Sequence, residues 1–232
     1  DIDQDGDIDI VWGYQDSNKI KIIENLDGRT FAEPVAFNAS GGPSDLQLVD
    51  LNLDGRLDLI YAQRFGDCLA KKIRLGDGRF GPTECLINQR TKGHAVQLDS
   101  DPELELISVT DGILKVFQLN SDGAVLAEEP LQGAPSWGPG ERHVILDADH
   151  DGDQDVIALG LVDGKRFVSL LSNQGDGTFS ECPLITNAPE ELRFIDVGDS
   201  NNDGLIDLIS AETCALCEST VRVHLQNNLS VC

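Results

Sequence analysis

One acidic motif recurs along the chain, with the pattern Asp-x-(Asp/Asn)-x-Asp-Gly-x-x-Asp and oxygen-bearing side chains at positions 1, 3, 5 and 9. Ionised carboxylates this close repel one another, and a bound dication removes that penalty. Hard oxygen donors select calcium over zinc or copper. We therefore predict about four Ca²⁺ ions, one in each complete copy. The predicted side-chain ligands are Asp1, Asp3, Asp5, Asp9, Asp50, Asn52, Asp54, Asp58, Asp147, Asp149, Asp151, Asp155, Asp199, Asn201, Asp203 and Asp207.

The glycine at position 6 permits the sharp turn that gathers these ligands. A backbone carbonyl at position 7 is expected to complete each set, from Asp7, Arg56, Asp153 and Leu205. The motif is not an EF-hand, because that loop needs a bidentate Glu at position 12, which no copy has. A solvated acidic turn is the alternative interpretation. We prefer that alternative for the degenerate copy Asp99–Glu105, which has lost the glycine and the spacing.

The charge excludes two classes of partner. The 232 residues include 17 Lys and Arg against 41 Asp and Glu, a formal net charge of −24. Nucleic-acid backbones and anionic membrane surfaces both require clustered cations, so neither is an expected partner. No apolar run is long enough to insert into a membrane. Four calcium ions would bring the charge from −24 to −16, and chelation should destabilise the protein.

The acidic loops define a repeat. They start near residues 1, 50, 99, 147 and 199, in steps of 49, 49, 48 and 52. Short β-branched segments flank them, as strands do. Those that enter the loops are 46–49, 96–98 and 144–146, those that leave are 8–12, 57–61, 104–109, 156–159 and 205–210, and the next set is 19–23, 73–75, 114–119, 167–171 and 221–225.

Each unit therefore predicts four strands, which we denote A to D, with the acidic loop between A and B. Four-stranded antiparallel units repeating every 40–50 residues are typical of an all-β fold, the β-propeller, in which each unit is a blade. Residues 1–232 are expected to form a single propeller domain or a partial propeller. The first unit lacks strand A and the last lacks strand D, so we expect the chain to belong to a longer propeller.

The acidic loops with their following apolar residues, at 50–60, 147–157 and 199–209, and the later segment Asn173–Phe179, resemble FG-GAP/VCBS repeats. The resemblance covers essentially the whole chain and implies an integrin-α-like β-propeller that binds calcium in its hairpin loops. It indicates function poorly. The family includes cell-adhesion heads, lectin-like proteins, secreted bacterial surface proteins and propeller modules attached to enzymes.

Six cysteines indicate an oxidising compartment. Cys68 and Cys217 lie at equivalent positions of their repeats, and each has a cysteine near the end of its own unit. This predicts the pairs Cys68–Cys85 and Cys217–Cys232, which leaves Cys182–Cys214; a local Cys214–Cys217 pair is the alternative. Asn38 and Asn228 begin glycosylation sequons, which matter only in a secreted eukaryotic chain.

Outside the loops, His94 and His143 are expected just before strand A of successive units, with Arg142 beside them. At that level a polar ring could hold a ligand, although a solvated rim is the simpler interpretation. Trp137 is a candidate sugar-stacking platform or a plug between blades, whereas Trp12 is expected in the core. We find no nucleophile elbow or phosphate-binding glycine loop and predict no catalytic residues.

Three functions remain open. We rank first a calcium-stabilised extracellular or cell-surface module that recognises a protein or a glycan, because loops on rigid scaffolds carry such functions. A structural subunit that assembles with copies of itself ranks second, and the propeller scaffold of a polysaccharide-active enzyme ranks third.

Overall fold

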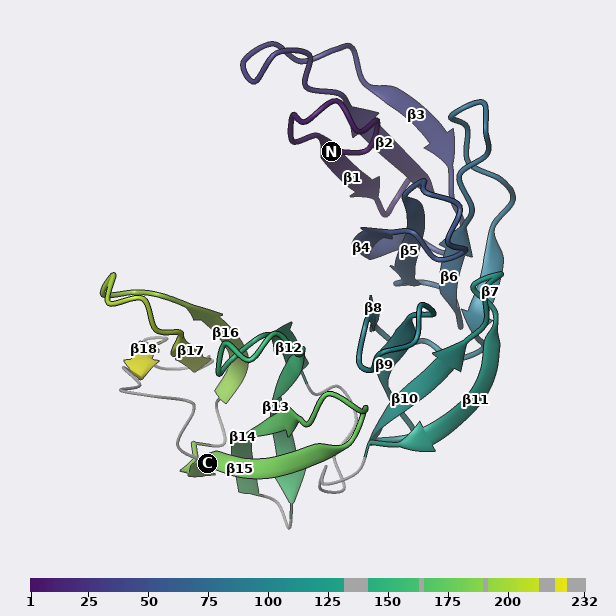
Figure 1. Cartoon of the computed structure of the whole chain (residues 1–232). Helices are drawn as coiled ribbons and strands as arrows, with labels where there is room; N and C mark the ends of the chain where they lie inside the picture. The colour runs from purple at the N-terminus through teal and green to yellow at the C-terminus, as the bar shows by residue number, and fades with distance from the viewer. Residues whose placement is uncertain (132–141, 163–164, 190–191, 213–219, 225–232) are drawn as a thin grey trace. The chain divides into compact units, whose positions relative to one another are not determined.

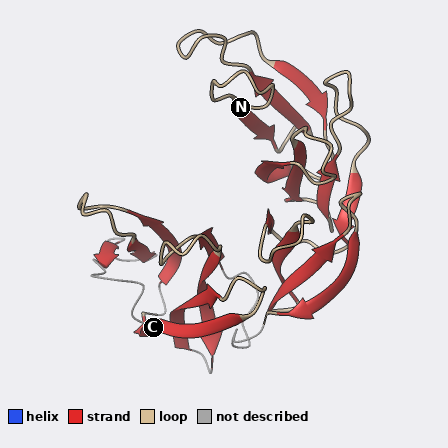
Figure 2. Ribbon diagram, viewed as in Figure 1, coloured by secondary structure: helices blue, strands red, loops and turns tan. Residues whose placement is uncertain are grey.

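The computed structural model describes residues 1–131, 142–162, 165–189, 192–212 and 220–224. Within this part of the chain every regular element is a strand (Figure 2). No helix there is long and apolar enough to cross a membrane. The strands form five sheets, which we call blades 1 to 5, and each follows the chain from one strand to the next (Figure 1).

Blades 2, 3 and 4 have four strands and blades 1 and 5 have three, as the repeat predicted. Blade 1 comprises β1 (Ile10–Tyr14), β2 (Lys19–Ile23) and β3 (Val35–Asn38). Blade 2 comprises β4 (Pro43–Val49), β5 (Asp58–Gln63), β6 (Leu69–Lys72) and β7 (Glu84–Ile87). Blade 3 comprises β8 (Gly93–Val96), β9 (Glu105–Thr110), β10 (Ile113–Leu119) and β11 (Val125–Pro130). Blade 4 comprises β12 (Arg142–Leu146), β13 (Asp155–Val162), β14 (Lys165–Asn173) and β15 (Phe179–Ala188). Blade 5 comprises β16 (Leu192–Gly198), β17 (Asp207–Glu212) and β18 (Thr220–His224).

The chain divides into two compact units. The first contains Asp1–Val96, Asp101–Ser108 and Val116–Glu129, and the second contains Gln97–Ser100, Val109–Lys115 and Pro130–Cys232. Blades 1 and 2 therefore belong to the first unit, and blades 4 and 5 to the second.

Within the first unit, apolar side chains fill the space between facing sheets. Ile20 of blade 1 is buried against Leu59 and Tyr61 of blade 2, and the rings of Phe37 and Phe80 stack with centroids 4.8 Å apart. Strand β5 is buried along its whole length. A strand covered on both faces shows little alternation of apolar and polar residues, which explains the continuous apolar runs in the sequence.

The second unit has a core of the same kind. Ile157, Leu159 and Val168 of blade 4 pack with Leu192 and Leu208 of blade 5. Strands β13 and β14 supply most of the blade 4 side chains in this core, and β16 of blade 5 lies against β12 and β13.

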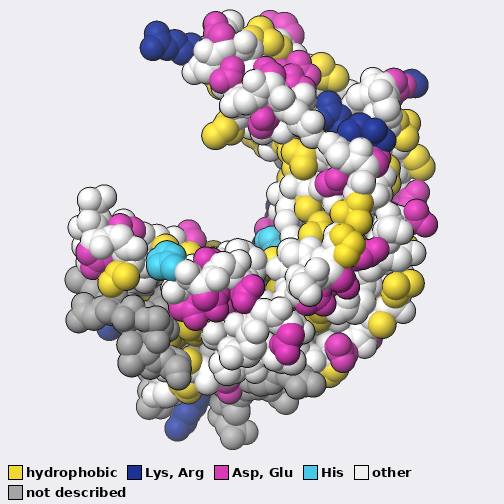
Figure 3. Space-filling model, in the orientation of Figure 1, with side chains coloured by type: hydrophobic (Ala, Val, Ile, Leu, Met, Phe, Trp, Pro, Cys, Tyr) yellow, Lys and Arg dark blue, Asp and Glu magenta, His cyan; other side chains and the backbone are white. Residues whose placement is uncertain are grey.

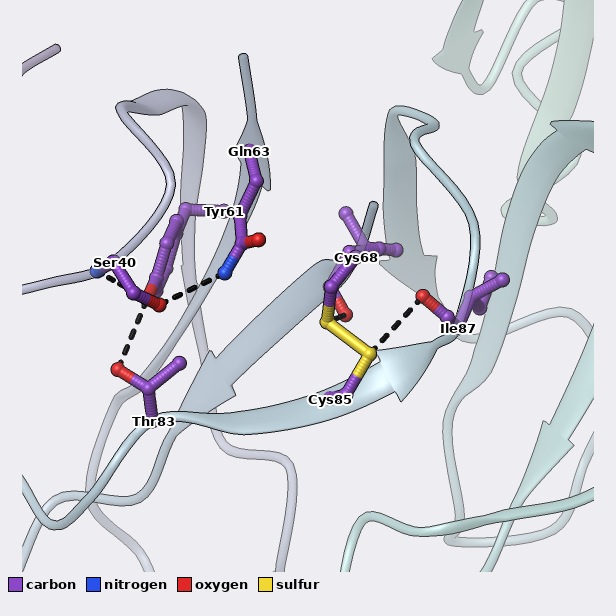
Figure 4. Close-up of a disulfide and its surroundings, with 8 residues drawn as sticks. Ser40, Tyr61, Gln63, Cys68, Thr83, Cys85 and Ile87 are labelled. Carbon is purple, nitrogen blue, oxygen red and sulfur yellow. Dashed lines mark hydrogen bonds between the residues drawn. A yellow bond between two sulfur atoms is a disulfide. The ribbon is translucent and has the colours of Figure 1, made fainter. Parts of the chain in front are cut away.

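A disulfide joins Cys68 to Cys85, with Cα atoms 5.8 Å apart, in agreement with the predicted pairing (Figure 4). It ties the link before β6 to β7. The Tyr61 hydroxyl lies 3.1 Å from the Thr83 hydroxyl and accepts a hydrogen bond from the Ser40 backbone N–H at 3.3 Å. This network holds the link that enters blade 2 against β5.

Three expectations about strands and core are wrong. The strand predicted at 96–98 is β8, Gly93–Val96, and Leu98 is buried although it lies beyond the strand. The strand predicted at 73–75 is β6, Leu69–Lys72, and residues 73–75 belong to the following turn, where Arg74 bridges Phe80. The lysines of β6 hide it in the sequence, because Lys71 and Lys72 are buried and donate to backbone carbonyls. Trp12 is not a core residue: it is exposed on β1.

Candidate metal centres

The four complete acidic loops have the same backbone conformation. The residue at position 4 is left-handed in each, with φ between 57° and 66°, although none is glycine. The glycine at position 6 has a φ of 83° to 101°. The position-4 residues are Gln4, Leu53, His150 and Asn202, and the glycines are Gly6, Gly55, Gly152 and Gly204. A left-handed non-glycine residue is costly and persists only where its surroundings hold it.

Hydrogen bonds within each loop supply that support. The position-1 carboxylate accepts the backbone N–H of the position-6 glycine in all four loops, at 2.8–3.2 Å. The side chain at position 3 accepts the N–H of position 5, and position 5 accepts the N–H of position 7. These bonds fix the orientation of the oxygen-bearing side chains in each loop.

The position-9 aspartate has a second task that the sequence did not reveal. In Asp155, one carboxylate oxygen accepts the N–H of Ala148 in the loop, and the other accepts the N–H of Asn173, both at 2.8 Å. Asp9 and Asp58 make the same pair of bonds. Asp207 accepts the N–H of Ser200. In three of the copies this carboxylate therefore holds its loop against the turn that follows two strands later. Its remaining lone pairs are available to a cation.

Three loops of the described chain each bring three carboxylates together. One oxygen from each of Asp1, Asp3 and Asp5 lies within 4.8 Å of the others, and the same holds for Asp147, Asp149 and Asp155. It also holds for Asp99, Asp101 and Glu105 of the degenerate copy, which the sequence alone gave no reason to expect. In the second group, Oδ1 of Asp147 is buried without a hydrogen-bond partner. A buried, unsatisfied carboxylate oxygen is costly, and a cation would satisfy it. The donor set therefore fits a hard cation such as calcium.

The pKa shifts have the same cause. The pKa of Asp155 is raised to about 6, because burial and the charges of Asp149 and Asp151 outweigh the backbone hydrogen bonds from Ala148 and Asn173. Burial and its charged neighbours likewise raise the pKa of Asp149. Burial also raises the pKa of Asp58, against the backbone hydrogen bonds from Arg74 and Leu51. Asp9 differs: burial raises its pKa, but the N–H groups of Asn25 and Ile2 outweigh that effect and lower it.

The other two loops are already partly neutralised. Position 3 is an amide there, and its nitrogen donates to the position-5 carboxylate, from Asn52 to Asp54 and from Asn201 to Asp203, both at 2.9 Å. In the second loop the Arg56 guanidinium also pairs with Asp54. These loops carry one carboxylate fewer and make internal bonds that a cation would have to replace.

The loops also contact the turns and one another. A Cβ atom on Gly175, whose φ is +78°, would lie 2.7 Å from a carboxylate oxygen of Asp153, so the turn passes close beside the loop. In the first unit the Gln4 side-chain amide donates to the Gly55 carbonyl at 2.6 Å and joins two neighbouring loops. The sequence contained no signal for this contact, because the two residues belong to different repeats.

The predicted ligand-site residues are dispersed in the structure. His94 lies within β8 and His143 within β12, rather than before these strands. Around His94, Lys92 pairs with Asp45 at 2.5 Å. Burial lowers the pKa of His94, Asp45 acts to raise it, and Lys92 acts to lower it. Arg142 begins β12.

Several predicted residues cannot be placed. Trp137, Cys214, Cys217, Cys232 and Asn228 lie outside the described residues. Cys182 is disulfide-bonded, and its pairing with Cys214 stays a prediction. Asn38 is exposed at the end of β3, as a glycosylation site requires.

A family model described as FG-GAP-like repeat matches residues 1–61 and 147–210, which together make up more than half of the chain. The chain belongs to the FG-GAP-like repeat family. The matched segments contain all four complete acidic loops, at 1–9, 50–58, 147–155 and 199–207. This FG-GAP-like chain thus carries the family's repeats in both compact units.

One solved structure shows the same fold, and a second aligns less well. A lectin from Agrocybe aegerita that specifically recognises non-reducing terminal N-acetylglucosamine aligns with a TM-score of 0.58 and 17% identity, over 94% of this chain and 66% of that one. This chain spans just under two thirds of the lectin's length. An endo-arabinase from Bacteroides thetaiotaomicron aligns with a TM-score of 0.49 and 16% identity, over 95% of this chain and 91% of that one. No curated protein matches the sequence. The FG-GAP-like chain is an all-β protein built from the four-stranded antiparallel blades of a β-propeller.

Proposed function

We propose that this protein is a calcium-stabilised binding module that works outside the cytoplasm and recognises a glycan or a protein. The observation that carries the proposal is the common geometry of the four acidic loops. Each holds its oxygen donors in one hydrogen-bonded arrangement, and one contains a buried carboxylate oxygen with no hydrogen-bond partner, Oδ1 of Asp147.

Calcium would act on stability rather than on chemistry. Acidic side chains are spread over the visible surface, whereas Lys and Arg occupy few places (Figure 3). With a net charge of −24, the folded chain repels itself. Binding of a cation to the folded state alone stabilises that state by mass action.

Thermal melting in calcium and in metal-free buffer tests this role. We expect the midpoint to be higher in calcium. Sodium chloride at matched ionic strength is the control, because screening alone would also relieve repulsion. An equal midpoint in the two buffers would contradict the proposal.

The loops should differ in affinity. Affinity for calcium rises with the number of charged ligands. The loops that begin at Asp1 and Asp147 have a carboxylate at position 3, whereas those that begin at Asp50 and Asp199 have an amide there. Calcium titration followed by calorimetry should therefore resolve two tighter and two weaker sites.

The fold, the disulfide and the lectin with the same fold support ligand recognition outside the cytoplasm. We place the ligand contact at the cluster of Asp45 on β4, Lys92 just before β8 and His94 on β8. Glycans ending in N-acetylglucosamine are the first probes, immobilised and tested with wild type and the His94→Ala variant. Retention that the variant loses supports the site, and no retention of any glycan by wild type favours a protein ligand.

We propose a binding module rather than an enzyme. Incubation of polysaccharides with wild type should release no products. Product release that disappears in His94→Ala would establish the enzyme alternative instead.

A further inference from the structure

Two neighbouring acidic loops are joined through one arginine. We call them the first loop, Asp1–Asp9, and the second loop, Asp50–Asp58. Arg74 lies in the turn after β6, and its backbone N–H donates to Oδ1 of Asp58 at 2.7 Å. Its guanidinium Nη1 donates to the carbonyl of Ile2 in the first loop. Arg74 therefore holds the second loop with its backbone and the first loop with its side chain.

These contacts continue to predicted metal ligands on both sides. In the first loop, the N–H of Ile2 donates to Oδ2 of Asp9 at 2.6 Å. In the second loop, Nε of Arg56 donates to the Arg74 carbonyl at 3.2 Å. A path of hydrogen bonds and short backbone segments therefore joins the two position-9 aspartates, Asp9 and Asp58.

The path is shielded from water. Ile2 is 1% exposed, and Asp58 is fully buried. Nε of Arg74 is buried and makes no hydrogen bond, so the guanidinium is already partly desolvated. Hydrogen bonds are stronger in such surroundings, and losing one that a charged group makes is costly. The bond from Arg74 to Ile2 is therefore a firm link between the loops.

A second link joins the same two loops at their surface. The side-chain amide of Gln4 donates to the carbonyl of Gly55 at 2.6 Å. The N–H of Gly55 in turn donates to Oδ2 of Asp50 at 2.8 Å. The left-handed position 4 of the first loop is thereby connected to the position-1 ligand of the second loop.

Other blades also place a turn against the preceding loop. In blade 4, Nδ2 of Asn173 donates at 2.8 Å to the carbonyl of Leu98, which precedes the degenerate loop. In blade 3, a Cβ atom on Gly123 would lie 2.9 Å from the carbonyl oxygen of Leu51 in the second loop. The contact therefore belongs to the repeat, and in blades 1 and 2 it joins two complete acidic loops.

We propose that Arg74 couples the first and second loops, so that a calcium ion in one loop raises the affinity of the other. The inference rests on the calcium binding proposed above. The carboxylates of the first loop repel one another without metal, and an ion that gathers them also fixes the backbone at Ile2. The second loop, held to Ile2 through Arg74, then loses less conformational freedom when it binds its own ion. Such coupling is reciprocal and typically changes affinity about 5–150-fold.

Calorimetric calcium titration of a variant that retains only these two loops tests the proposal. We expect its two ions to bind cooperatively. Disabling the first loop with Asp3→Asn and Asp5→Asn should weaken binding at the second loop by about fivefold or more. The amide oxygens can still accept the backbone N–H groups that these aspartates accept in the wild type, so the turn is preserved. The substitutions of the two-loop background are Asp101→Asn, Asp147→Asn, Asp149→Asn, Asp199→Asn and Asp203→Asn.

Arg74→Leu in this background should make the two sites independent. The variant keeps the backbone N–H that Asp58 binds and loses only the side-chain link. Arg79→Leu is the matched control, because it removes the same charge from the same turn, where the Arg79 guanidinium pairs with Asp77. Loss of positive charge alone would strengthen calcium binding in both variants and leave the cooperativity unchanged.

Gln4→Asn tests the second link without changing the charge. Asparagine tolerates the left-handed backbone, but its shorter side chain should not reach Gly55. We expect the cooperativity to fall part of the way. Because Gln4 is exposed, this variant also decides the question if Arg74→Leu fails the check of folding by circular dichroism.

The outcomes separate this inference from the calcium proposal. Two ions that bind independently in the two-loop background would overturn the coupling and leave calcium binding intact. A background that binds no calcium would overturn both. Cooperativity lost in Arg74→Leu and kept in Arg79→Leu supports the role of Arg74, whereas equal loss in the two variants would assign the effect to charge and overturn that role.

Discussion

Asp155 should make the metal-free protein less stable as the pH rises, which is the reverse of ordinary acid unfolding. The carboxylate is fully buried in the described structure, and its pKa is raised from 3.8 to about 6 by burial and by neighbouring carboxylates. A raised pKa means that the folded state holds the proton more tightly than the unfolded state does. The contribution of Asp155 to stability is therefore full below about pH 4, falls as the pH rises toward about 6, and is absent above. His94, whose pKa is lowered, acts in the opposite direction.

The size of the effect follows from the shift. A difference of about 2 units corresponds to roughly 3 kcal/mol at 1.36 kcal/mol per unit. The rest of the loop is exposed, and solvent screening reduces this to about 1–2 kcal/mol. Asp149 and Asp58, whose pKa values are also raised, contribute in the same direction.

Urea unfolding in metal-free buffer at several pH values between 4 and 7 measures this slope. Asp155→Asn should flatten it, even though the amide leaves one backbone N–H unsatisfied and costs about 1–3 kcal/mol at every pH. Asp67→Asn is the control, because it removes the same charge from an exposed link. With saturating calcium the carboxylates stay ionised, and the fall should disappear. An Asp155→Asn variant with the wild-type slope between pH 4 and 6 would refute the reasoning.

Two further substitutions test the packing around the loops. Gly175→Ala should cost about 1–2 kcal/mol in backbone strain plus the displacement of Asp153, whereas Gly78→Ala, with a φ of +81° and open space around it, should cost the strain alone; equal losses in thermal melts would argue against the close contact. Cys68→Ser with Cys85→Ser opens a disulfide that spans 17 residues and should lower the free energy of unfolding by about 3 kcal/mol. Urea unfolding of wild type and double variant without reductant measures this loss, because reductant would also open the disulfide of Cys182. An unchanged midpoint in the double variant would contradict the expectation.

The sequence predicted what depends on local spacing. The five repeats, the four loops and the Cys68–Cys85 pair follow from motifs within one repeat, where each residue determines its neighbours' geometry. Glycine at position 6 signals the left-handed turn that the structure contains. Local patterns of this kind are the most dependable part of a sequence.

Longer-range features could not be predicted. The N–H groups that bind the position-9 carboxylates come from turns 16 to 18 residues away, and every residue has such a group. Strand β6 lacks the apolar pattern of a buried strand. Its Lys71 is buried because the ammonium donates a hydrogen bond to the Gly123 carbonyl of the next blade. Trp12 looked like a core residue because its strand pattern is that of a buried strand. Its exposure depends on which side of blade 1 packs on a neighbouring sheet, and the sequence of one strand does not contain that information.

Counting the calcium ions bound to each chain tests the central claim most directly. Equilibrium dialysis followed by elemental analysis of the wild type should give about four ions, and Asp147→Asn with Asp149→Asn should give about three. Zero or one ion on the wild type at saturating calcium would contradict the account, and the acidic loops would then be solvated turns.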